Sequence, residues 1–450
     1  MTAATEAHLA RRLTLPSVVA FGVSYMAPSL VMVIFGIIAV ASAGTAPTAF
    51  AIATAAMLLT ALSYAKMARV YPVSGSAYFY ARHNLGSRVG FLVGWSVLLD
   101  YLFLPMVAWL TQSILLNAQF PAVPIWAWML INAGFTTTVN VVGIVVADRV
   151  NKVFTSVALF LVLLFFGYCI THLAGHHPVS YTAPFWNADT TIAGVSAAAA
   201  IAAYSFLGFD AVTTLAEETK DPKRNIPRAV VLVIAIGGAM FIVVAYVMQL
   251  VHPGDMFDDA QSAAYGMSID VGGQFFADWT NLAGIIAATA SCLAVQLSSS
   301  RLLYIMGRDG VLPKRIFGYL NPRTLTPVYC VLLTGAMCFV GLNLSLETAT
   351  GFINFGAFLG FTAVNLCVIA YYLRNRRERH LNVVSYLVVP AIGGCVTIYM
   401  LTQLSSVSLT IGLTWFAIGV VYLAWLTRGF RRPTPELSIG EEQALIDADK

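Results

Sequence analysis

The chain has 450 residues, of which 59% are hydrophobic and only 10% are charged, and its mean hydropathy is +0.79. Soluble domains carry about 25% charged residues, so this composition excludes an ordinary soluble protein of the same length. The 6 cysteines are too few for a disulfide scaffold, and a net charge of +4 is no argument for nucleic-acid binding. The composition predicts a polytopic membrane protein.

Long apolar stretches predict twelve transmembrane helices. A helix needs about 20 apolar residues to cross the bilayer, whereas the alternating segments of a membrane β-barrel are shorter. We therefore expect an all-α protein. Its spans are residues 15–42, 46–65, 89–118, 125–147, 153–173, 191–216, 229–251, 271–300, 326–346, 348–373, 384–403 and 408–427.

The basic residues predict how these spans are oriented. All 25 Lys and Arg residues fall in the terminal tails or in every second connecting segment. The opposite segments, such as 252–270, contain no Lys or Arg. Basic segments remain on the cytoplasmic side. We therefore expect the tails 1–14 and 428–450 to be cytoplasmic, and the protein to lie in the plasma or inner membrane.

Two spans are interrupted near their middle. Pro28 removes a backbone donor in the first span and clashes with the preceding turn, although alone it would also fit a simple kink. Unwound backbone at this depth is tolerated where it is buried in protein or lines a polar cavity. The first break comprises Tyr25, Met26, Ala27, Pro28 and Ser29. The second comprises Ser205, Phe206, Leu207, Gly208, Phe209 and Asp210.

The two breaks occupy corresponding positions if the chain consists of two five-span halves, 15–173 and 191–373. Because five is an odd number, the second half would enter the membrane in the opposite direction. Matching interrupted spans in inverted repeats indicate the mid-membrane binding site of a secondary transporter. We therefore predict a 5+5 inverted-repeat fold, with two additional helices in residues 384–427 and the substrate at the two breaks.

Two acidic residues, Asp100 and Asp210, lie deep within the third and sixth spans. An acid at this depth costs about 2.5–3.5 kcal/mol, and no span carries a Lys or Arg at comparable depth. Each acid is therefore either protonated, as a structural group, or neutralised by a cation from outside. A cationic amine satisfies the second alternative. Aromatic rings that could add cation–π attraction are Tyr25, Tyr101, Phe206 and Phe209.

Carboxyl groups are also the candidates for proton transfer. Because no histidine lies at depth, a proton relay would use Asp100, Asp210 and Glu217, although Glu217 also fits a structural role. The cysteines lie in apolar runs, and we expect no metal site and no cofactor. The chain lacks the H-E-x-x-H and G-x-S-x-G patterns of hydrolases, so we do not expect an enzyme.

Several motifs resemble those of the amino acid–polyamine–organocation permeases, and among these the bacterial putrescine importers most closely. They cover residues 90–96, 99–106, 205–219, 222–229, 307–313 and 353–357. The resemblance implies the inverted-repeat fold, with the third, eighth and tenth spans around the two breaks. It also implies proton symport. Sodium is less expected, although Ala27, Ser298 and Ser299 offer oxygen ligands.

The sequence therefore predicts a secondary active importer of a small cationic amine, putrescine or a related polyamine, that works by alternating access. The alternative is an amino-acid permease or an amine/amino-acid exchanger of the same superfamily. The sequence departs from both patterns. The first span lacks the acid that such putrescine importers carry. It also has Met26, Ala27 and Pro28 where amino-acid members have a glycine-rich break, which argues against an α-amino acid.

Overall fold

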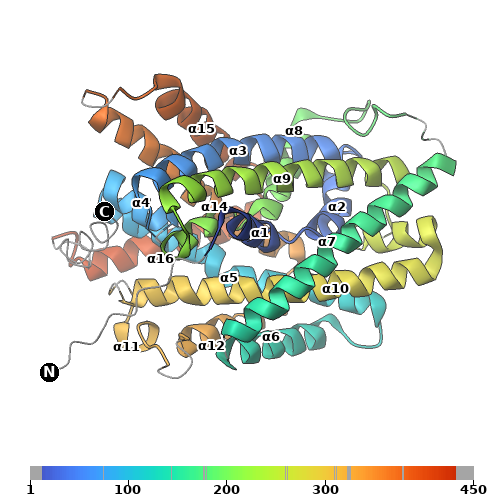
Figure 1. The fold of residues 1–450 in the computed structure, drawn as a ribbon, viewed down its shortest axis with the longest axis horizontal. Helices are drawn as coiled ribbons and strands as arrows, with labels where there is room; N and C mark the ends of the chain where they lie inside the picture. The colour runs from blue at the N-terminus through green and yellow to red at the C-terminus, as the bar shows by residue number, and fades with distance from the viewer. Residues whose placement is uncertain are drawn as a thin grey trace.

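The protein is helical throughout the part that the structure describes. The computed structural model describes residues 13–73, 76–142, 144–175, 178, 180–258, 260, 262–308, 310, 312–321, 326–377 and 380–431. Within these ranges the structure has no β-strand, and its β-pairing is limited to one isolated bridge between Leu13 and Thr219. The long helices lie side by side along the long axis of the molecule (Figure 1). The expected all-α class is confirmed.

The first five predicted spans correspond to six helices, because the first span is split in two. A short helix, α4 (Ser76–Leu85), connects the second and third spans. The helices are α1 (Leu15–Tyr25), α2 (Leu30–Ala41), α3 (Ala46–Val70), α5 (Ser87–Gln119), α6 (Ile125–Val142) and α7 (Ile144–Gly175).

The sixth to tenth predicted spans include the second split helix and α10, which is kinked at Gly273. Their elements are α8 (Ile192–Ala202), η1 (Ala203–Phe206), η2 (Asp210–Glu218), α9 (Pro222–Val251), α10 (Ala263–Arg308), α11 (Lys314–Phe317), α12 (Val328–Ala336), α13 (Cys338–Gly341) and α14 (Leu346–Asn375). The chain continues through η3 (Val384–Val388), a π-helical turn, into α15 (Val389–Thr402) and α16 (Ser406–Leu426).

Nine helices in the described ranges are long and apolar enough to cross a membrane, and the bent pair α1 and α2 makes a tenth if it counts as one span. Residues 328–341 form shorter apolar helices. A polytopic membrane fold is therefore confirmed, whereas the count of twelve spans stays a prediction.

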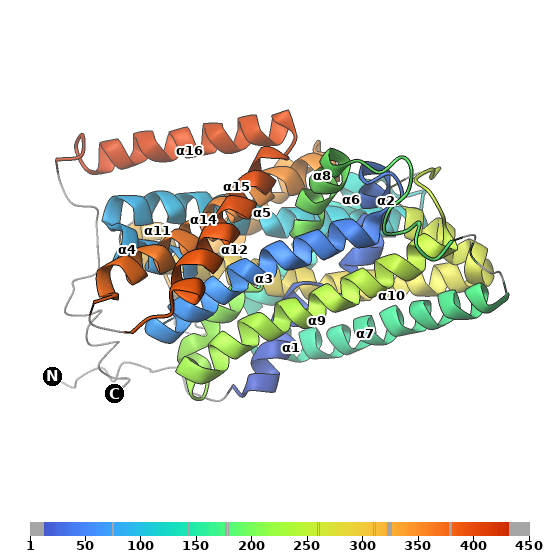
Figure 2. The same cartoon turned by 90° about the horizontal axis from the view of Figure 1, so that it is seen from above.

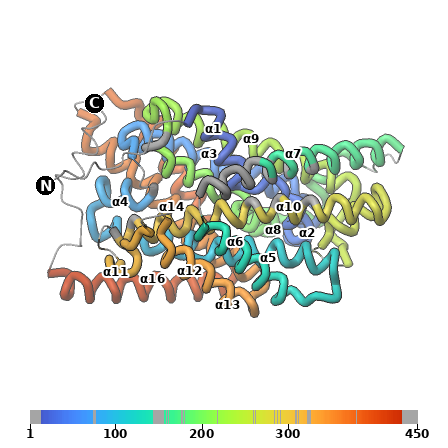
Figure 3. The backbone as a smooth tube through the Cα atoms, turned by 60° about the horizontal axis from the view of Figure 1, so that its bottom comes forward, coloured from blue at the N-terminus to red at the C-terminus, as the bar shows by residue number. Residues whose placement is uncertain are grey.

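The two split helices lie among the long helices. α1 packs against α9, and α2 packs against α8 and α9. On the other side, α5 packs against both α10 and α14. The last helix, α16, runs along one edge of the molecule in two views (Figures 2 and 3). The helix breaks are thus surrounded by intact helices, which bury their backbone groups as the membrane requires.

A pair of tryptophans fixes α16 against α5. The rings of Trp95 and Trp415 stack with their centroids 4.9 Å apart. Each indole N–H donates to the backbone carbonyl of the other residue, at 2.9 and 2.8 Å. Gly419 permits this approach, because an added Cβ would lie 2.2 Å from Cδ1 of Trp95. Small residues commonly allow such close helix contacts in membranes.

We therefore expect Gly419→Ala to push α16 away from α5 and to destabilise the protein by about 1–3 kcal/mol, the usual cost of overpacking. The measurement is the thermal stability of the detergent-purified protein. Gly134→Ala is the matched control, because an added Cβ at Gly134 meets nothing within 4 Å. Equal stability of the two variants would contradict the tight contact.

Candidate functional site

The first break lies at the predicted place. α1 ends at Tyr25, α2 begins at Leu30, and the two helices are bent by 47°. Ala27 has a φ of 47°, a left-handed conformation that is uncommon for a residue with a side chain. Strained backbone of this kind persists where the surrounding structure enforces it, and it is common at functional sites.

The second break also lies where the sequence predicts it. α8 ends at Ala202 and η1 ends at Phe206, after which Leu207 has a ψ of 136° and Gly208 has a φ of 100°. Glycine adopts this positive φ without steric cost. The chain then continues as η2, a 3₁₀-helix that begins at Asp210, and not as an α-helix. The sixth span is therefore narrower and more tightly wound after its break.

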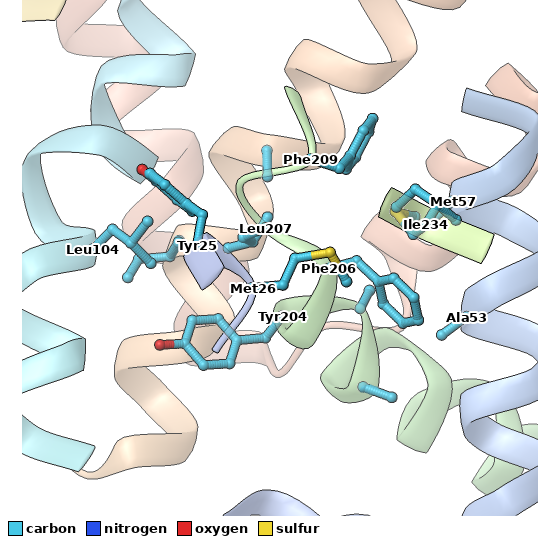
Figure 4. Close-up of a cluster of buried hydrophobic side chains, with 14 of the residues drawn as sticks. Tyr25, Met26, Ala53, Met57, Leu104, Tyr204, Phe206, Leu207, Phe209 and Ile234 are labelled. Carbon is cyan, nitrogen blue, oxygen red and sulfur yellow. The ribbon is translucent and has the colours of Figure 1, made fainter. Parts of the chain in front are cut away.

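The two breaks touch each other at the centre of the molecule. An added Cβ on Gly208 would lie 1.7 Å from Cδ1 of Tyr25, so the tyrosine ring lies directly on the backbone of the second break. Figure 4 shows Tyr25 and Met26 next to Leu207 and Tyr204. One turn earlier, a Cβ on Gly22 would lie 2.7 Å from Val212. The absence of a side chain at Gly208 thus allows the two split helices to meet.

The two acids lie buried beside this contact, and each is 4% exposed. The hydroxyl of Tyr101 donates to Oδ2 of Asp210 at 3.1 Å, and backbone N–H groups at the second break also face the Asp210 carboxyl. Oδ1 of Asp100 has no hydrogen-bond partner among the described residues. No described Lys or Arg side chain contacts either acid. This is an incompletely satisfied acidic pair, and such buried groups require an explanation.

A partly open cavity lies next to the acidic pair, and about 560 Å³ of empty space, including open solvent, is associated with it. The first break contributes Tyr25, Met26, Ala27 and Ser29 to its wall. The second break contributes Leu207, together with Tyr204, which the sequence analysis did not single out. The wall is mostly apolar with a few hydroxyl groups, as is usual for a small-molecule site.

One face of α5 forms another part of the cavity wall. Leu104, Ala108, Thr111 and Leu115 follow Asp100 at steps of three or four residues, so all share that face. Oγ1 of Thr111 is buried without a hydrogen-bond partner among the described residues. Reading this helical face outward from Asp100 could have identified Thr111 from the sequence.

Several predicted site residues do not line the cavity. Asp100, Tyr101 and Asp210 lie behind its wall, and the wall does not include Pro28, Ser205 or Gly208. The ring of Phe206 packs on Phe241 of α9, with centroids 5.3 Å apart. The ring of Phe209 packs on Tyr64 of α3 at 5.4 Å. Figure 4 shows both phenylalanines pointing away from the side that Tyr25 and Tyr204 face.

Glu217 lies in η2, but its side chain is outside the part of the molecule that the structure describes, so its role stays a prediction. Within the described ranges, no three His, Cys, Asp or Glu side chains are grouped so that they could hold a metal ion.

Comparisons with known proteins agree with this architecture. A family model described as "Amino acid permease" matches residues 20–425. The chain is 38% identical over 438 residues to the low-affinity putrescine importer PlaP of Escherichia coli strain K12, covering 96% of this chain and 97% of that protein. It is 26% identical to the branched-chain amino acid permease BcaP of Bacillus subtilis, covering 92% and 93% of the two chains. It is 29% identical to human cationic amino acid transporter 4, covering 81% of this chain and 60% of that protein.

These matches extend over both helix breaks and nearly all of the long helices. The proteins are named as importers, permeases and transporters, not as enzymes. The chain belongs to the amino acid permease family and is a multi-pass membrane transporter.

Proposed function

We propose that this transporter imports a small cationic amine, putrescine or a related polyamine, by alternating access. The observation that carries the proposal is the buried pair Asp100 and Asp210, which no described basic side chain neutralises. An ammonium group supplies both the missing charge and three hydrogen-bond donors. The 38% identity to a protein named as a putrescine importer supports the same substrate class.

The acids accept the ammonium group in a second step after the amine enters the cavity. The cavity ends at Tyr25 and does not reach either carboxyl group. Tyr25 and Tyr204 offer aromatic faces to a cation in the cavity, a contact that contributes about 0.5–2 kcal/mol. Movement of the Tyr25 ring off Gly208 then opens the way to Asp210. Tyr101 releases the Asp210 carboxylate as the ammonium replaces it.

The cavity opens toward the outside of the cell in this arrangement. The wall residues of α5 follow Asp100 along the chain, so they lie toward the end of α5 that is remote from Arg88. The positive-inside rule puts the Arg88 end in the cytoplasm. The same rule gives cytoplasmic termini, and a bacterial relative supports an inner-membrane location.

Aromatic side chains close the cytoplasmic side. The ring of Phe209 packs against the rings of Phe361 of α14 and Tyr64 of α3. The ring centroids are 5.1 and 5.4 Å apart. The ring of Tyr80 of α4 packs against that of Tyr64, with centroids 6.2 Å apart. Phe209 directly precedes Asp210, so an inward-open state requires the second break to move away from α3 and α14. The two breaks rocking against intact helices would supply that motion, as in other transporters with split helices.

The membrane potential favours uptake of such a substrate. Each positive charge entering a negative interior gains about 2.3 kcal/mol per 100 mV. A dication thus gains about 4.6 kcal/mol, which corresponds to roughly 2,000-fold accumulation. Proton symport through Asp100, Asp210 and Glu217 adds to this driving force in the proposed mechanism. Sodium is the less favoured coupling ion.

Uptake into liposomes tests the proposed function. The purified protein should accumulate radiolabelled putrescine in a saturable manner when the interior is negative, and an inward proton gradient should increase the accumulation. An exchanger would require amine or amino acid inside the liposomes. Saturable uptake of neutral amino acids without uptake of putrescine would contradict the proposal and favour the amino-acid permease alternative.

Asp210→Asn should reduce amine uptake at least about 100-fold, because an amide cannot neutralise the ammonium and a buried unpaired charge costs several kcal/mol. Uptake and surface expression are measured in parallel. The control is Asp189→Asn, which alters an exposed acid outside the helices. Unchanged substrate affinity in Asp210→Asn would refute the role of this carboxyl group.

Asp100→Asn should impair uptake of diamines more than uptake of monoamines, by about tenfold, because one end of a diamine loses its counter-charge. Competition of labelled putrescine by a series of mono- and diamines of equal chain length measures this ratio. Equal losses for both series would mean that Asp100 has a structural role.

Gly208→Ala should block transport while the membrane insertion of the protein is retained. The added Cβ would overlap the Tyr25 ring, and it would also strain a backbone with a φ of 100°. Gly254→Ala separates the two effects, because Gly254 has a φ of 93° but open space around it. If both variants transport equally well, the contact between the two breaks is not needed for transport.

A further inference from the structure

A second cavity adjoins the central one on its outer side. It lies between α2, α5 and α10, and it is partly open, with about 540 Å³ of empty space that includes open solvent. Ser29, Val33 and Leu115 line both cavities, so the two share part of their walls. The outer cavity extends along α5 to Ala118, at the end of the helix remote from Arg88.

A turn at Gly273 brings a tyrosine of the cavity wall together with a carboxylate that lies outside the wall. Gly273 has a φ of 75° and a ψ of 177°, so the chain changes direction within α10. Tyr265, which lines the cavity, donates its hydroxyl to Oδ1 of Asp278 at 2.7 Å. Gln274 donates to the same oxygen at 2.8 Å. These donors are neutral, so Asp278 keeps a net negative charge beside the cavity.

A buried asparagine adds an acceptor to the cavity wall. Asn281 is 7% exposed, and its Nδ2 donates to the carbonyl of Leu115 at 2.9 Å and to Oε1 of Gln119 at 3.2 Å. Both amide hydrogens are therefore used by α5. Among the described residues no donor reaches its Oδ1, although Asn281 lines the cavity. An unpaired acceptor next to an aromatic ring and a carboxylate suits a ligand with several N–H donors.

The outer segments of the chain favour a cation at this place. The connecting segment 252–270 carries acidic residues but no Lys or Arg, so no fixed positive charge there repels an incoming amine. A cleft lined by one sign of charge raises the local concentration of oppositely charged ligands. The chemistry of the wall and the surrounding charge therefore select the same class of ligand.

We propose that this outer cavity is a second binding site, which holds a primary ammonium group between Tyr265, Asn281 and the Asp278 carboxylate before the amine moves to the central cavity. The proposal rests on the proposed function, because it assumes a cationic substrate. It assigns to Asp278 a role in substrate capture that is separate from the roles of Asp100 and Asp210. The contribution of Tyr265 is its ring, and that of Asn281 is its free carbonyl oxygen.

A cysteine placed in the cavity tests the site without relying on transport. Ala118 is a half-buried wall residue on α5, and Ala118→Cys introduces a small reactive group there. The probes are a cationic and a neutral methanethiosulfonate reagent, and the protein without Ala118→Cys corrects for its native cysteines. The measured quantity is the rate at which the cationic reagent labels the introduced cysteine, divided by the rate for the neutral reagent. Asp278→Asn should lower this ratio about 3- to 10-fold. Asp278→Glu, which keeps the charge, should preserve the ratio if the fold is intact.

Transport kinetics give the second measurement. Asp278→Asn should raise the KM for putrescine about fivefold and leave the maximal rate within about twofold. Putrescine should also slow labelling of the introduced cysteine in the Asp210→Asn background, where the central site is disabled. An unchanged rate ratio and an unchanged KM, in a protein that takes up putrescine normally, would overturn the outer site alone. Absence of putrescine uptake by the unaltered protein, with the rate ratio still dependent on Asp278, would instead overturn the proposed function.

Discussion

Burial of two carboxyl groups that no described basic side chain neutralises is the constraint on which the rest of the structure depends. Asp100 and Asp210 lie inside a helical membrane protein, where an uncompensated charge is costly. The hydroxyl of Tyr101 donates to one oxygen of Asp210, but one oxygen of Asp100 has no described partner. In the proposed mechanism, protons neutralise the two acids when the site is empty. The cationic substrate would then compete with protons for the same groups, which would link amine binding to proton movement.

The backbone at the two breaks separates these acids from the cavity. Gly208 and Ala27 adopt left-handed conformations, and the ring of Tyr25 rests on Gly208. The resulting contact separates the acids from the cavity on one side. On the other side, Phe209 closes against α3 and α14. Both barriers belong to the broken segments, so one movement of these segments can change access to the acids from either side.

Much of this arrangement is readable from the sequence, because the decisive residues have strong local preferences. Pro28 and Gly208 predict the breaks, which the structure confirms. The orientation of Phe206 and Phe209 toward α9 and α3 was not readable, because the interrupted backbone has no helical periodicity from which to assign a face. Thr111 was readable from the spacing along α5. The outer cavity was not, because it depends on the turn at Gly273 and on contacts between distant helices.

The most direct test of the central claim is an experimental structure of the protein with bound putrescine. One ammonium nitrogen should lie within about 3 Å of the Asp210 carboxylate, with Tyr101 displaced and the second nitrogen near Asp100. Density for the amine elsewhere, with the hydrogen bond between Tyr101 and Asp210 intact, would contradict the claim that these acids recognise the substrate.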